Sequence, residues 1–502
     1  MTRLTFIVCL LIAVALATYQ GIRMVKPAGV THANMRDVNY LNVKKDLQVI
    51  AAQPHPTASP HQAKVRRYLQ ETITEMGYRV EEQPFTFAIA DLVQQQRNLY
   101  AKLNEAQRQA FDAELARVGA AGDFEKEVRI RSGLRHGEYG QGVNLIVRHT
   151  VAGATDSVIF MAHYDSVGTA PGASDNGMAV ASLLQLMRET ISRDDVKNNI
   201  IFLFTDAEEL GLVGAKHFVA QLTPDARQAI GAVINFEARG NQGVPLLFET
   251  SAQNYRLINA LNQGVRNIVA FSFTPLIYQM LQNDTDLTAF KPLHRAGLNF
   301  AVVEGFEHYH HMSDTVENLP LLTLFRYQNT VREVGRQFIH KVDISKLYHK
   351  KDAIYFPLPS GRLLVMPLIA AYLSGISVFI LCAMLAWQRR AFQALTIILP
   401  GLLCVALAIL LPTAAYMVTL PMLFYMTQAI LRPHRHLADL TTLLGVYFTG
   451  LLYVPVLYLI AYGLQLPFIT AILGLMIIGL WSIPIATRIR HPASLPMAED
   501  MT

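Results

Sequence analysis

The carboxyl-terminal part of the chain is a series of long apolar runs, and this feature constrains the fold more than any other. From residue 362 onward, five segments are each long enough to cross a bilayer core of about 30 Å. They are Leu363–Trp387, Leu395–Leu411, Thr413–Leu431, Leu440–Leu464 and Leu466–Ile485. Because 52% of the residues are apolar and 16% are charged, the chain is predicted to join a membrane region to a polar one.

A further apolar run, Leu4–Ala17, stands behind Arg3 at the amino terminus. Such a run is either a cleaved secretory signal or an uncleaved anchor. No strong small-x-small cleavage site precedes Gly21, so we favour a transmembrane anchor over residues 1–22.

Positive charge alternates along the carboxyl-terminal spans. The turns near Pro412 and Gln465 contain no Lys or Arg, whereas the ends of the first, third and fifth spans are each followed by two arginines. These arginines are Arg389, Arg390, Arg432, Arg435, Arg488 and Arg490. The positive-inside rule then predicts five transmembrane helices over 362–487 and a cytoplasmic tail over 488–502. It places the preceding polar region on the extracytoplasmic side, periplasmic or lumenal, although Arg23 and Lys26 oppose this weakly.

The spans contain no Asp or Glu apart from Asp439 at one border. Ion pathways and proton relays usually need such groups inside the membrane. The spans therefore indicate an anchor or platform in the lipid bilayer rather than a transporter. The net charge of +5 is small for 502 residues, and the arginines form no basic stripe, so no nucleic-acid partner is expected.

The polar region, residues 30–345, alternates short apolar runs rich in β-formers with helical patterns, and a linker is expected over 346–361. The predicted strands are Tyr78–Glu82, Val143–Val147, Ser157–Ala162, Ile200–Phe204, Ala232–Phe236, Pro245–Phe248 and Leu298–Val303. The predicted helices are Gln62–Met76, Ala179–Thr190, Gly214–Gln221, Asn254–Asn262 and Thr315–Val342. This order predicts an α/β fold with a mostly parallel central sheet flanked by helices. Residues 91–127 have helical spacing and read as a surface insertion or a lid.

All three cysteines, Cys9, Cys382 and Cys404, lie in apolar stretches. The polar region therefore has no disulfide, no thiolate metal site and no cysteine nucleophile. A metal ion in this region must be held by histidines and carboxylates.

Five short polar segments follow predicted strands, where open α/β sheets bind ligands. They contain His163 and Asp165, then Asp175, then Glu208 and Glu209, then Glu237, and finally His308–Thr315. Asp165 can orient the His163 ring through a hydrogen bond, and Asp175 can bridge two cations. Adjacent acids such as Glu208 and Glu209 repel unless positive charge lies beside them, so one can bind metal while the other acts as a base.

Each segment alone has an ordinary structural reading. A His-x-Asp pair is often a surface hydrogen bond, a Glu-Glu pair a solvated helix start, and Asp-Asn-Gly a turn. Imidazole and carboxylate groups at successive strand ends are a much less ordinary combination. Together they predict a metal site in one crevice.

The order His-x-Asp, Asp, Glu-Glu, Asp/Glu, His resembles the di-zinc aminopeptidases and carboxypeptidases of metallopeptidase clan MH. The likeness is strongest to the branch with aminopeptidase Y-like enzymes, the endoplasmic reticulum metallopeptidase and the vacuolar membrane protease. It covers about residues 45–340, and the segments Pro54–Pro60, Glu237–Gly243 and Tyr309–Thr315 share it. In the apolar region the likeness is one of architecture only.

The resemblance implies two Zn²⁺ ions. His163 and Glu237 would bind one, Glu209 and His310 the other, and Asp175 would bridge them. Glu208 would be the general base and Asp165 the partner of His163. Many relatives have Asp where this chain has Glu237, and His311 stands where relatives often have Thr, so the choice of His310 rests on its spacing from Tyr309 and Asp314.

The resemblance implies a membrane-bound zinc exopeptidase that hydrolyses peptides, with an aminopeptidase favoured over a carboxypeptidase. Tyr309 is a candidate substrate-binding residue. Arg239 could bind a substrate carboxylate, or it could be a structural cation that balances Glu208 and Glu209. Two alternatives stay open: a non-peptidase amide hydrolase or glutaminyl cyclase-like enzyme on the same fold, and an inactive binding domain on a membrane scaffold.

Overall fold

A computed structural model describes residues 3–26, 38–191, 193, 195–280, 284–348, 350–387, 391–431 and 434–459. The chain divides into two compact units, residues 26–367 and residues 1–25 with 368–502. The predicted fifth span and the predicted tail lie outside the described residues. So do five of the six arginines used to predict the orientation; of the six, Arg435 alone is described.

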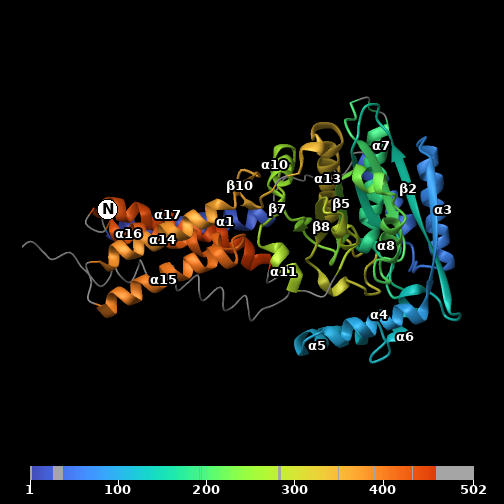
Figure 1. The fold of residues 1–502 in the computed structure, drawn as a ribbon, viewed down its shortest axis with the longest axis horizontal. Coiled ribbons are helices and arrows are strands. Elements are labelled where there is room, and N and C mark those ends of the chain that lie inside the picture. The colour runs from blue at the N-terminus through green and yellow to red at the C-terminus, as the bar shows by residue number, and fades with distance from the viewer. Residues whose placement is uncertain are drawn as a thin grey trace, which may run out of the picture. The chain divides into compact units, whose positions relative to one another are not determined.

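The larger unit is built on an eight-stranded mixed sheet with the order β1-β2-β4-β3-β5-β8-β6-β7 (Figure 1). The four central strands β4, β3, β5 and β8 are parallel. The pairs β1–β2, β2–β4 and β6–β8 are antiparallel, and β6 pairs parallel with β7. The strands are β1 (Val80–Ala88), β2 (Tyr139–His149), β3 (Ser157–His163), β4 (Asn199–Thr205), β5 (Ile230–Ala238), β6 (Leu246–Thr250), β7 (Val269–Ala270) and β8 (Ala296–Val302). This confirms the predicted α/β fold class.

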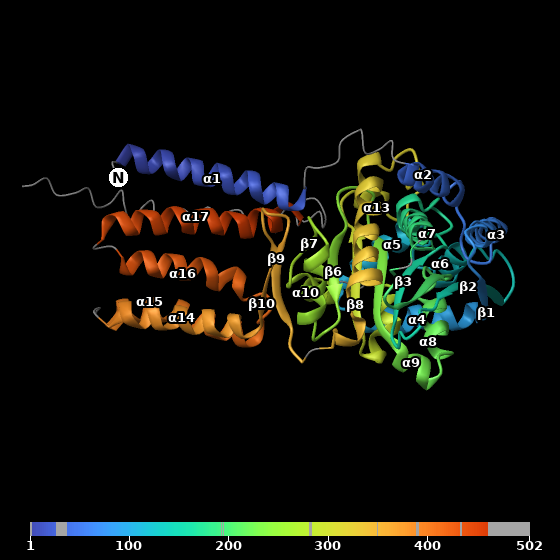
Figure 2. The same ribbon diagram turned by 90° about the horizontal axis from the view of Figure 1, so that it is seen from above.

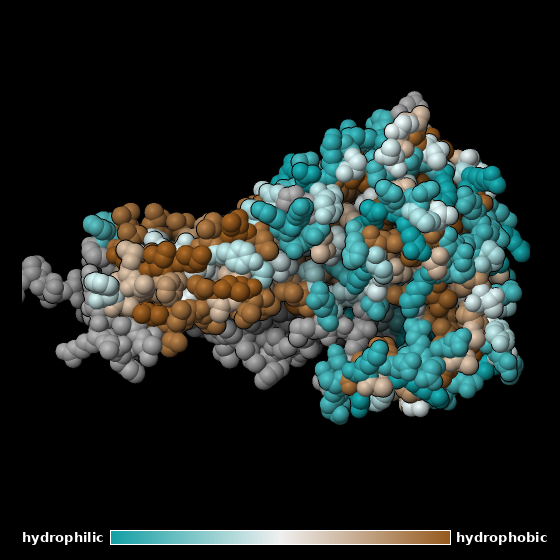
Figure 3. All heavy atoms as spheres, in the orientation of Figure 1, coloured by the Kyte–Doolittle hydropathy of each residue, from teal (hydrophilic) through white to brown (hydrophobic). Residues whose placement is uncertain are grey.

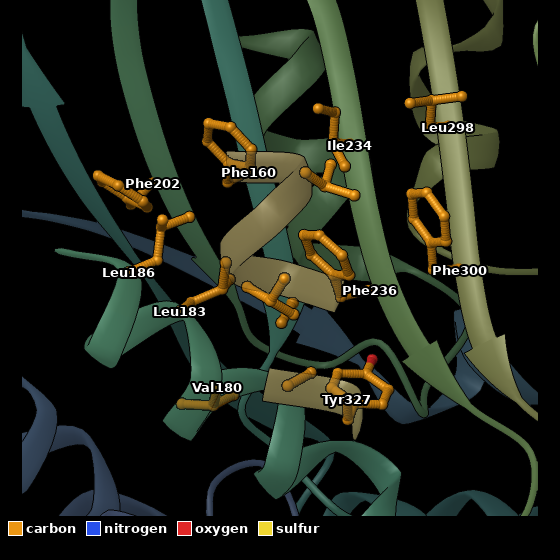
Figure 4. Close-up of a cluster of buried hydrophobic side chains, with 14 of the residues drawn as sticks. Phe160, Val180, Leu183, Leu186, Phe202, Ile234, Phe236, Leu298, Phe300 and Tyr327 are labelled. Atoms are coloured by element: carbon orange, nitrogen blue, oxygen red, sulfur yellow. The ribbon is translucent and has the colours of Figure 1, made fainter. Parts of the chain in front are cut away.

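Helices cover both faces of this sheet, as continuous apolar strands require. One face packs against α2 (Val38–Ile50), α3 (Pro60–Glu75), α7 (Met178–Ile191) and α13 (Leu321–Arg336). The other packs against α8 (Val213–Ala220) and α12 (Leu287–Phe290). Figure 4 shows the first face, where Phe160, Phe202, Phe236 and Phe300 belong to one apolar cluster with side chains of α7 and with Tyr327 of α13. The rings of Phe236 and Phe300 stack with centroids 5.5 Å apart.

Shorter elements complete the larger unit. They are α9 (Pro224–Ala229), α10 (Tyr255–Gly264), α11 (Thr274–Met280), and the turns η2 (Ala173–Gly177), η3 (Lys291–Leu293), η4 (Phe306–His308), η5 (Gln337–Lys341) and η6 (Ile344–Lys346). Several helix ends follow local sequence signals. At α3, for example, the Ser59 side chain accepts a hydrogen bond from the Gln62 N–H, and Pro60 occupies the first turn.

The predicted insertion is helical and comprises α4 (Ile89–Lys102), α5 (Glu105–Arg117) and α6 (Phe124–Ser132). It does not lie loosely on the surface. Leu92, Val93 and Val128 share an apolar cluster with Ala207 and Leu210, which flank Glu208 and Glu209 in the chain. The insertion is therefore packed against the loop that carries two of the predicted site residues.

The segment expected to be a linker, 346–361, differs in the structure. It contains β9 (Ala353–Pro357), which is entirely buried and pairs with β10 (Leu363–Pro367). The first predicted span consequently starts later, as α14 (Ile369–Ala386). The reason is that a short apolar run has the same composition whether it is a buried strand or the start of a span.

The smaller unit consists of apolar helices (Figure 2): α1 (Arg3–Val25), α14, α15 (Ala391–Leu410), α16 (Tyr416–Ile430) and α17 (Arg435–Tyr458). Helix α1 packs against α17, and α14 packs against α15 and α16. Three helices in the described part of the chain are long and apolar enough to cross a membrane, Leu4–Val25, Ile369–Ala386 and His436–Tyr458, and Ile397–Leu410 is shorter. Figure 3 shows the apolar surface of these helices and the mainly polar surface of the sheet unit.

Candidate metal centre

The predicted site residues lie at one edge of the sheet. His163 is the last residue of β3, Glu237 is near the end of β5, and Glu208 and Glu209 follow β4. Asp175 lies in η2, and His310 follows η4, the turn after β8. Because β3, β4, β5 and β8 are parallel, their carboxyl ends meet at the same edge, which brings distant segments together.

Two His-carboxylate groups share Asp175. The Nε2 atom of His163 lies 3.3 Å from Asp175 Oδ1 and 3.4 Å from Glu237 Oε2. The Nε2 atom of His310 lies 3.4 Å from Asp175 Oδ2 and 3.1 Å from Glu209 Oε2. Each oxygen of Asp175 therefore faces a different histidine. All five side chains are buried, at 1–6% exposure.

These distances and donor types fit zinc. Two ligand atoms at about 2.0–2.2 Å from a tetrahedral zinc ion lie about 3.3–3.6 Å apart, and imidazole and carboxylate are common zinc ligands. The ligand atoms of His163, Asp175 and Glu237 lie within 4.8 Å of one another, as do those of Asp175, Glu209 and His310. The Oε1 atom of Glu209 is buried and has no hydrogen-bond partner among the described residues.

The charges also favour a cation. Burial raises the pKa of Glu208 well above its ordinary value, and the neighbouring Glu237 and Glu209 raise it further while His163 opposes them. Burial also raises the pKa of Glu237. Burial acts in the same direction on Asp175, but hydrogen bonds from His163 and His310 lower its pKa to about 2. Four carboxylates in one buried pocket repel one another, and divalent cations would relieve that repulsion.

Neighbouring segments hold the turn that carries Asp175. Asp314 accepts hydrogen bonds from the Ser174 N–H and Oγ–H at 2.8 and 2.7 Å, and from the Asp175 N–H at 3.1 Å. Thr169 Oγ1 donates to the His310 carbonyl at 3.0 Å. Asp314 thus links the His308–Thr315 segment to the Asp175 turn, which gives the Tyr309–Thr315 pattern a structural basis.

Asp165 makes different contacts from those expected. The His163 Nδ1 atom is 3.0 Å from the Asp165 backbone carbonyl and 3.5 Å from its carboxylate. The Asp165 carboxylate instead accepts hydrogen bonds from the backbone N–H groups of Glu208 and Glu209, at 3.2 and 3.3 Å. Its contact to the His163 ring is the longer one, and its main contacts are with the Glu208–Glu209 backbone.

The choice between His310 and His311, and the position of Tyr309, can now be compared with the structure. His310 is buried and faces Asp175 and Glu209, whereas His311 is exposed and contacts Ser313 Oγ at 2.7 Å. The Tyr309 ring stacks on the His310 ring with centroids 3.7 Å apart. Tyr309 therefore supports the position of His310 directly.

Arg239 contacts an aromatic ring. Its guanidinium lies 5.1 Å from the centroid of the Phe306 ring. Arg131, on α6 of the insertion, forms ion pairs with two buried acids. Its Nη1 is 3.2 Å from Glu209 Oε2 and its Nε is 2.7 Å from Glu127 Oε1. No local motif indicates Arg131, because 78 residues separate it from Glu209 in the chain.

A second buried network supports the Glu208 loop. Thr57, in the Pro54–Pro60 segment, donates to Asp165 Oδ2 at 3.3 Å and to Asp206 Oδ1 at 2.9 Å. Asp206 also accepts hydrogen bonds from Gln62 Nε2 at 2.7 Å and from the Val143 N–H at 2.8 Å. Burial, together with the nearby Asp165, raises the pKa of Asp206 to about 7. The Pro54–Pro60 segment therefore holds Asp206, at the start of the Glu208 loop, and Asp165 through hydrogen bonds.

Comparison with known proteins finds a family model that matches the part of the chain containing these residues. Residues 144–335 match the sequence model of peptidase family M28, and this range contains His163, Asp175, Glu208, Glu209, Glu237 and His310. The vacuolar membrane protease of Candida dubliniensis is 25% identical over 396 residues, which cover 75% of this chain and 38% of that protein. Endoplasmic reticulum metallopeptidase 1 of Mus musculus is 29% identical over 186 residues, which cover 36% of this chain and 20% of that protein.

A solved structure, the aminopeptidase from Aneurinibacillus sp. strain AM-1, is 18% identical and aligns with a TM-score of 0.44 over 59% of this chain and 92% of that one. The chain spans 38% of the length of the first curated relatives it matches. The family match and these relatives agree with the group indicated by the sequence motifs. The chain is thus similar, over residues 144–335, to peptidase family M28.

Proposed function

We propose that the chain is a membrane-bound, zinc-dependent exopeptidase, and specifically an aminopeptidase. The observation that carries this proposal is the position of Asp175, whose two oxygens face His163 and His310 at 3.3 and 3.4 Å. A carboxylate shared by two His-carboxylate groups suits a pair of metal ions. His163 and Glu237 would hold one zinc ion, His310 and Glu209 the other, and Asp175 both.

Bound zinc would supply Lewis-acid polarisation of the scissile carbonyl and a water whose pKa is lowered toward about 7. Glu208 would accept a proton from this water at a carboxylate oxygen and later donate it to the nitrogen of the departing amine. It is suited to this role because it lies beside the metal-binding groups: ligand atoms of His163, Glu208 and Glu209 lie within 4.8 Å of one another.

Asp165 would keep Glu208 in place. Its carboxylate accepts hydrogen bonds from the backbone N–H groups of Glu208 and Glu209. One side chain would therefore position both the general base and the neighbouring zinc ligand. Tyr309 would keep the His310 ring in its orientation by stacking. The branch that the motifs resemble favours recognition of a free amine, and this supports an aminopeptidase.

The proposed location follows from the arginines that border the apolar spans, which place the sheet unit on the extracytoplasmic side. The candidate spans of the helical unit and the named membrane relatives support a multi-pass membrane protein. The natural substrate would then be peptides in the periplasm or in an organelle lumen.

Hydrolysis by the full-length chain in detergent tests the proposal. Peptides with a free amino end should be cleaved, peptides with a blocked amino end should not, and a chelator should abolish cleavage. Glu208→Gln should keep its zinc and lose about 10²–10⁴-fold in rate, the usual contribution of a positioned base. A Glu208→Gln protein that cleaves as fast as the wild type would contradict the assigned role of Glu208. Cyclisation of amino-terminal glutamine without peptide cleavage would favour the cyclase alternative.

A further inference from the structure

A row of buried polar side chains crosses the sheet beside the metal centre. Asn235 on β5 is the register neighbour of Asn299 on β8, and Asn299 is the register neighbour of Glu249 on β6. Their exposures are 0%, 0% and 6%. Buried strands of such sheets are usually apolar, and burying polar groups is unfavourable unless they are hydrogen-bonded. These three residues, the polar row, therefore need an explanation.

Hydrogen bonds make the polar row continuous with the site. Asn235 Nδ2 donates to Glu237 Oε1 and to Asn299 Oδ1, both at 3.1 Å. Asn299 Nδ2 donates to Glu249 Oε2 at 2.9 Å and to Thr285 Oγ1 at 2.7 Å. Glu249 Oε1 lies 2.7 Å from the Nζ of Lys291, whose side chain is 49% exposed. The chain of contacts thus runs from a half-exposed lysine to Glu237.

The position of the row follows from strand alternation. Ile234 and Phe236, and likewise Leu298 and Phe300, point into the core on one face of the sheet (Figure 4). Side chains one residue along point to the opposite face. Asn235 and Asn299 therefore share that opposite face with Glu237, which lies two residues after Asn235 on β5.

The carboxylate at the far end sets the direction of these hydrogen bonds. An ionised carboxylate only accepts, so Glu249 requires the amide nitrogen of Asn299. This leaves the Asn299 oxygen facing Asn235, which must present its own nitrogen. The same nitrogen reaches Glu237 Oε1. Lys291 holds the other oxygen of Glu249 by direct contact, and the hydrogen bonds of the row extend this constraint to Glu237.

The result at the site is that the two oxygens of Glu237 have separate roles. Oε1 accepts a hydrogen bond from Asn235, while Oε2 lies 3.4 Å from His163 Nε2. We propose that Asn235, Asn299 and Glu249, anchored by Lys291, are positioning residues that orient the Glu237 carboxylate with Oε2 toward the metal. This inference rests on the proposed function, in which Glu237 is a zinc ligand.

Zinc affinity, measured by competition with a coloured chelator, tests the row in the full-length protein in detergent. Groups that hydrogen-bond to a metal ligand typically contribute 10–100-fold to metal affinity. We therefore expect Glu249→Leu to weaken zinc binding about 10–100-fold. Glu249→Gln should keep most of the affinity because its amide oxygen still accepts from Asn299. Lys291→Met should also weaken zinc binding.

Arg336→Met is the matched control. Arg336 is 50% exposed and pairs with the 12%-exposed Glu189 at 2.8 Å, so it resembles the Lys291–Glu249 pair without touching the row. It should leave zinc affinity unchanged. The thermal midpoint of the metal-free protein, measured for each variant, separates a loss of metal affinity from a general loss of stability.

Wild-type zinc affinity in both Glu249→Leu and Lys291→Met would overturn the inference. Should Glu249→Leu fail to fold, Lys291→Met decides, because it changes a half-exposed side chain. Glu237→Gln separates the two proposals. If this variant weakens zinc binding while both row variants do not, the row alone is wrong. If the wild type binds no zinc, the proposed function fails and the inference fails with it.

Discussion

At the scale of single residues, His55 shows what burial does to a titratable group near the site. His55 is buried at 1% exposure. Its backbone N–H donates to Ser166 Oγ at 3.0 Å, and its ring Nδ1 lies 3.1 Å from the Gln53 carbonyl oxygen. Burial lowers the pKa of His55 to about 4, from 6.5. The folded chain therefore keeps this imidazole neutral where the unfolded chain would protonate it.

This shift predicts a loss of stability in acid. As the pH falls from 6.5 to about 4, the unfolded state binds a proton at His55 and the folded state does not. The free energy of unfolding should then fall by about 3 kcal/mol over this window. Thermal or denaturant unfolding of the metal-free protein at pH 7 and at pH 4.5 measures it. His55→Gln should show a smaller difference between the two pH values, and an equal difference in both proteins would contradict the shift.

The sequence could predict individual candidate site residues because each has a local signal. His163 directly follows a buried strand, and the spacing of His310 from Tyr309 and Asp314 separates it from His311, which is exposed in the structure. The contacts of Asp165 could not be predicted. They depend on where the backbone of residues 208–209 passes, and that path is set by packing between segments more than forty residues apart in the chain.

At the scale of elements, the insertion is joined to the metal centre through α6. Arg131 at its carboxyl end contacts Glu127 and Glu209, which have side-chain exposures of 2% and 3%. Gly168 meets the same helix: a Cβ atom there would lie 2.3 Å from the Ile130 carbonyl oxygen. Close backbone packing and a buried ion pair therefore fix the insertion beside the site.

Arg131→Met should consequently destabilise the metal-free protein. It leaves two buried carboxylates without this guanidinium, a change that typically costs about 3–5 kcal/mol. Zinc should restore part of the loss because it supplies positive charge at Glu209. Unfolding in detergent, with and without zinc, measures both effects.

Arg129→Met on the same helix is the control for Arg131→Met. Arg129 pairs with Glu125 at 2.8 Å, and that pair is more exposed, at 28% and 58%. Exposed pairs contribute about 0–1 kcal/mol. If the two variants lose equal stability, Arg131 is not the buried cation that the geometry indicates.

Most of the larger elements could be predicted from periodicity. The continuous apolar runs around Phe160, Phe202 and Ile234 indicated buried parallel strands, and the structure has β3, β4 and β5 there. The hairpin of β9 and β10 could not be recognised in the same way. Its apolar residues adjoin a predicted span, so the apolar composition continues without a break. The strand can be recognised only from tertiary contacts, chiefly the pairing of β9 with β10.

At the scale of the whole molecule, the chain joins a sheet unit with a polar surface to a unit of apolar helices. All three cysteines belong to the helical unit, as Cys9, Cys382 and Cys404. The sheet unit therefore offers a cysteine-free background for labelling. The predicted orientation depends on arginines around the spans, most of which lie outside the described residues.

A labelling experiment checks that orientation. Thr150 on the sheet unit and His434 before α17 are both exposed. With the native cysteines replaced, Thr150→Cys should react with a membrane-impermeant maleimide added outside a sealed compartment that exposes the extracytoplasmic face. His434→Cys should react only after permeabilisation. The reverse pattern would place the sheet unit in the cytoplasm.

The central claim of two zinc ions sharing Asp175 is tested most directly by the zinc content of the purified full-length protein. Elemental analysis should find about two zinc ions per chain in the wild type. His163→Ala and His310→Ala should each retain about one, because each removes a ligand from one group only. A folded wild-type protein that binds no zinc, or a single zinc ion lost equally with either histidine, would contradict the account.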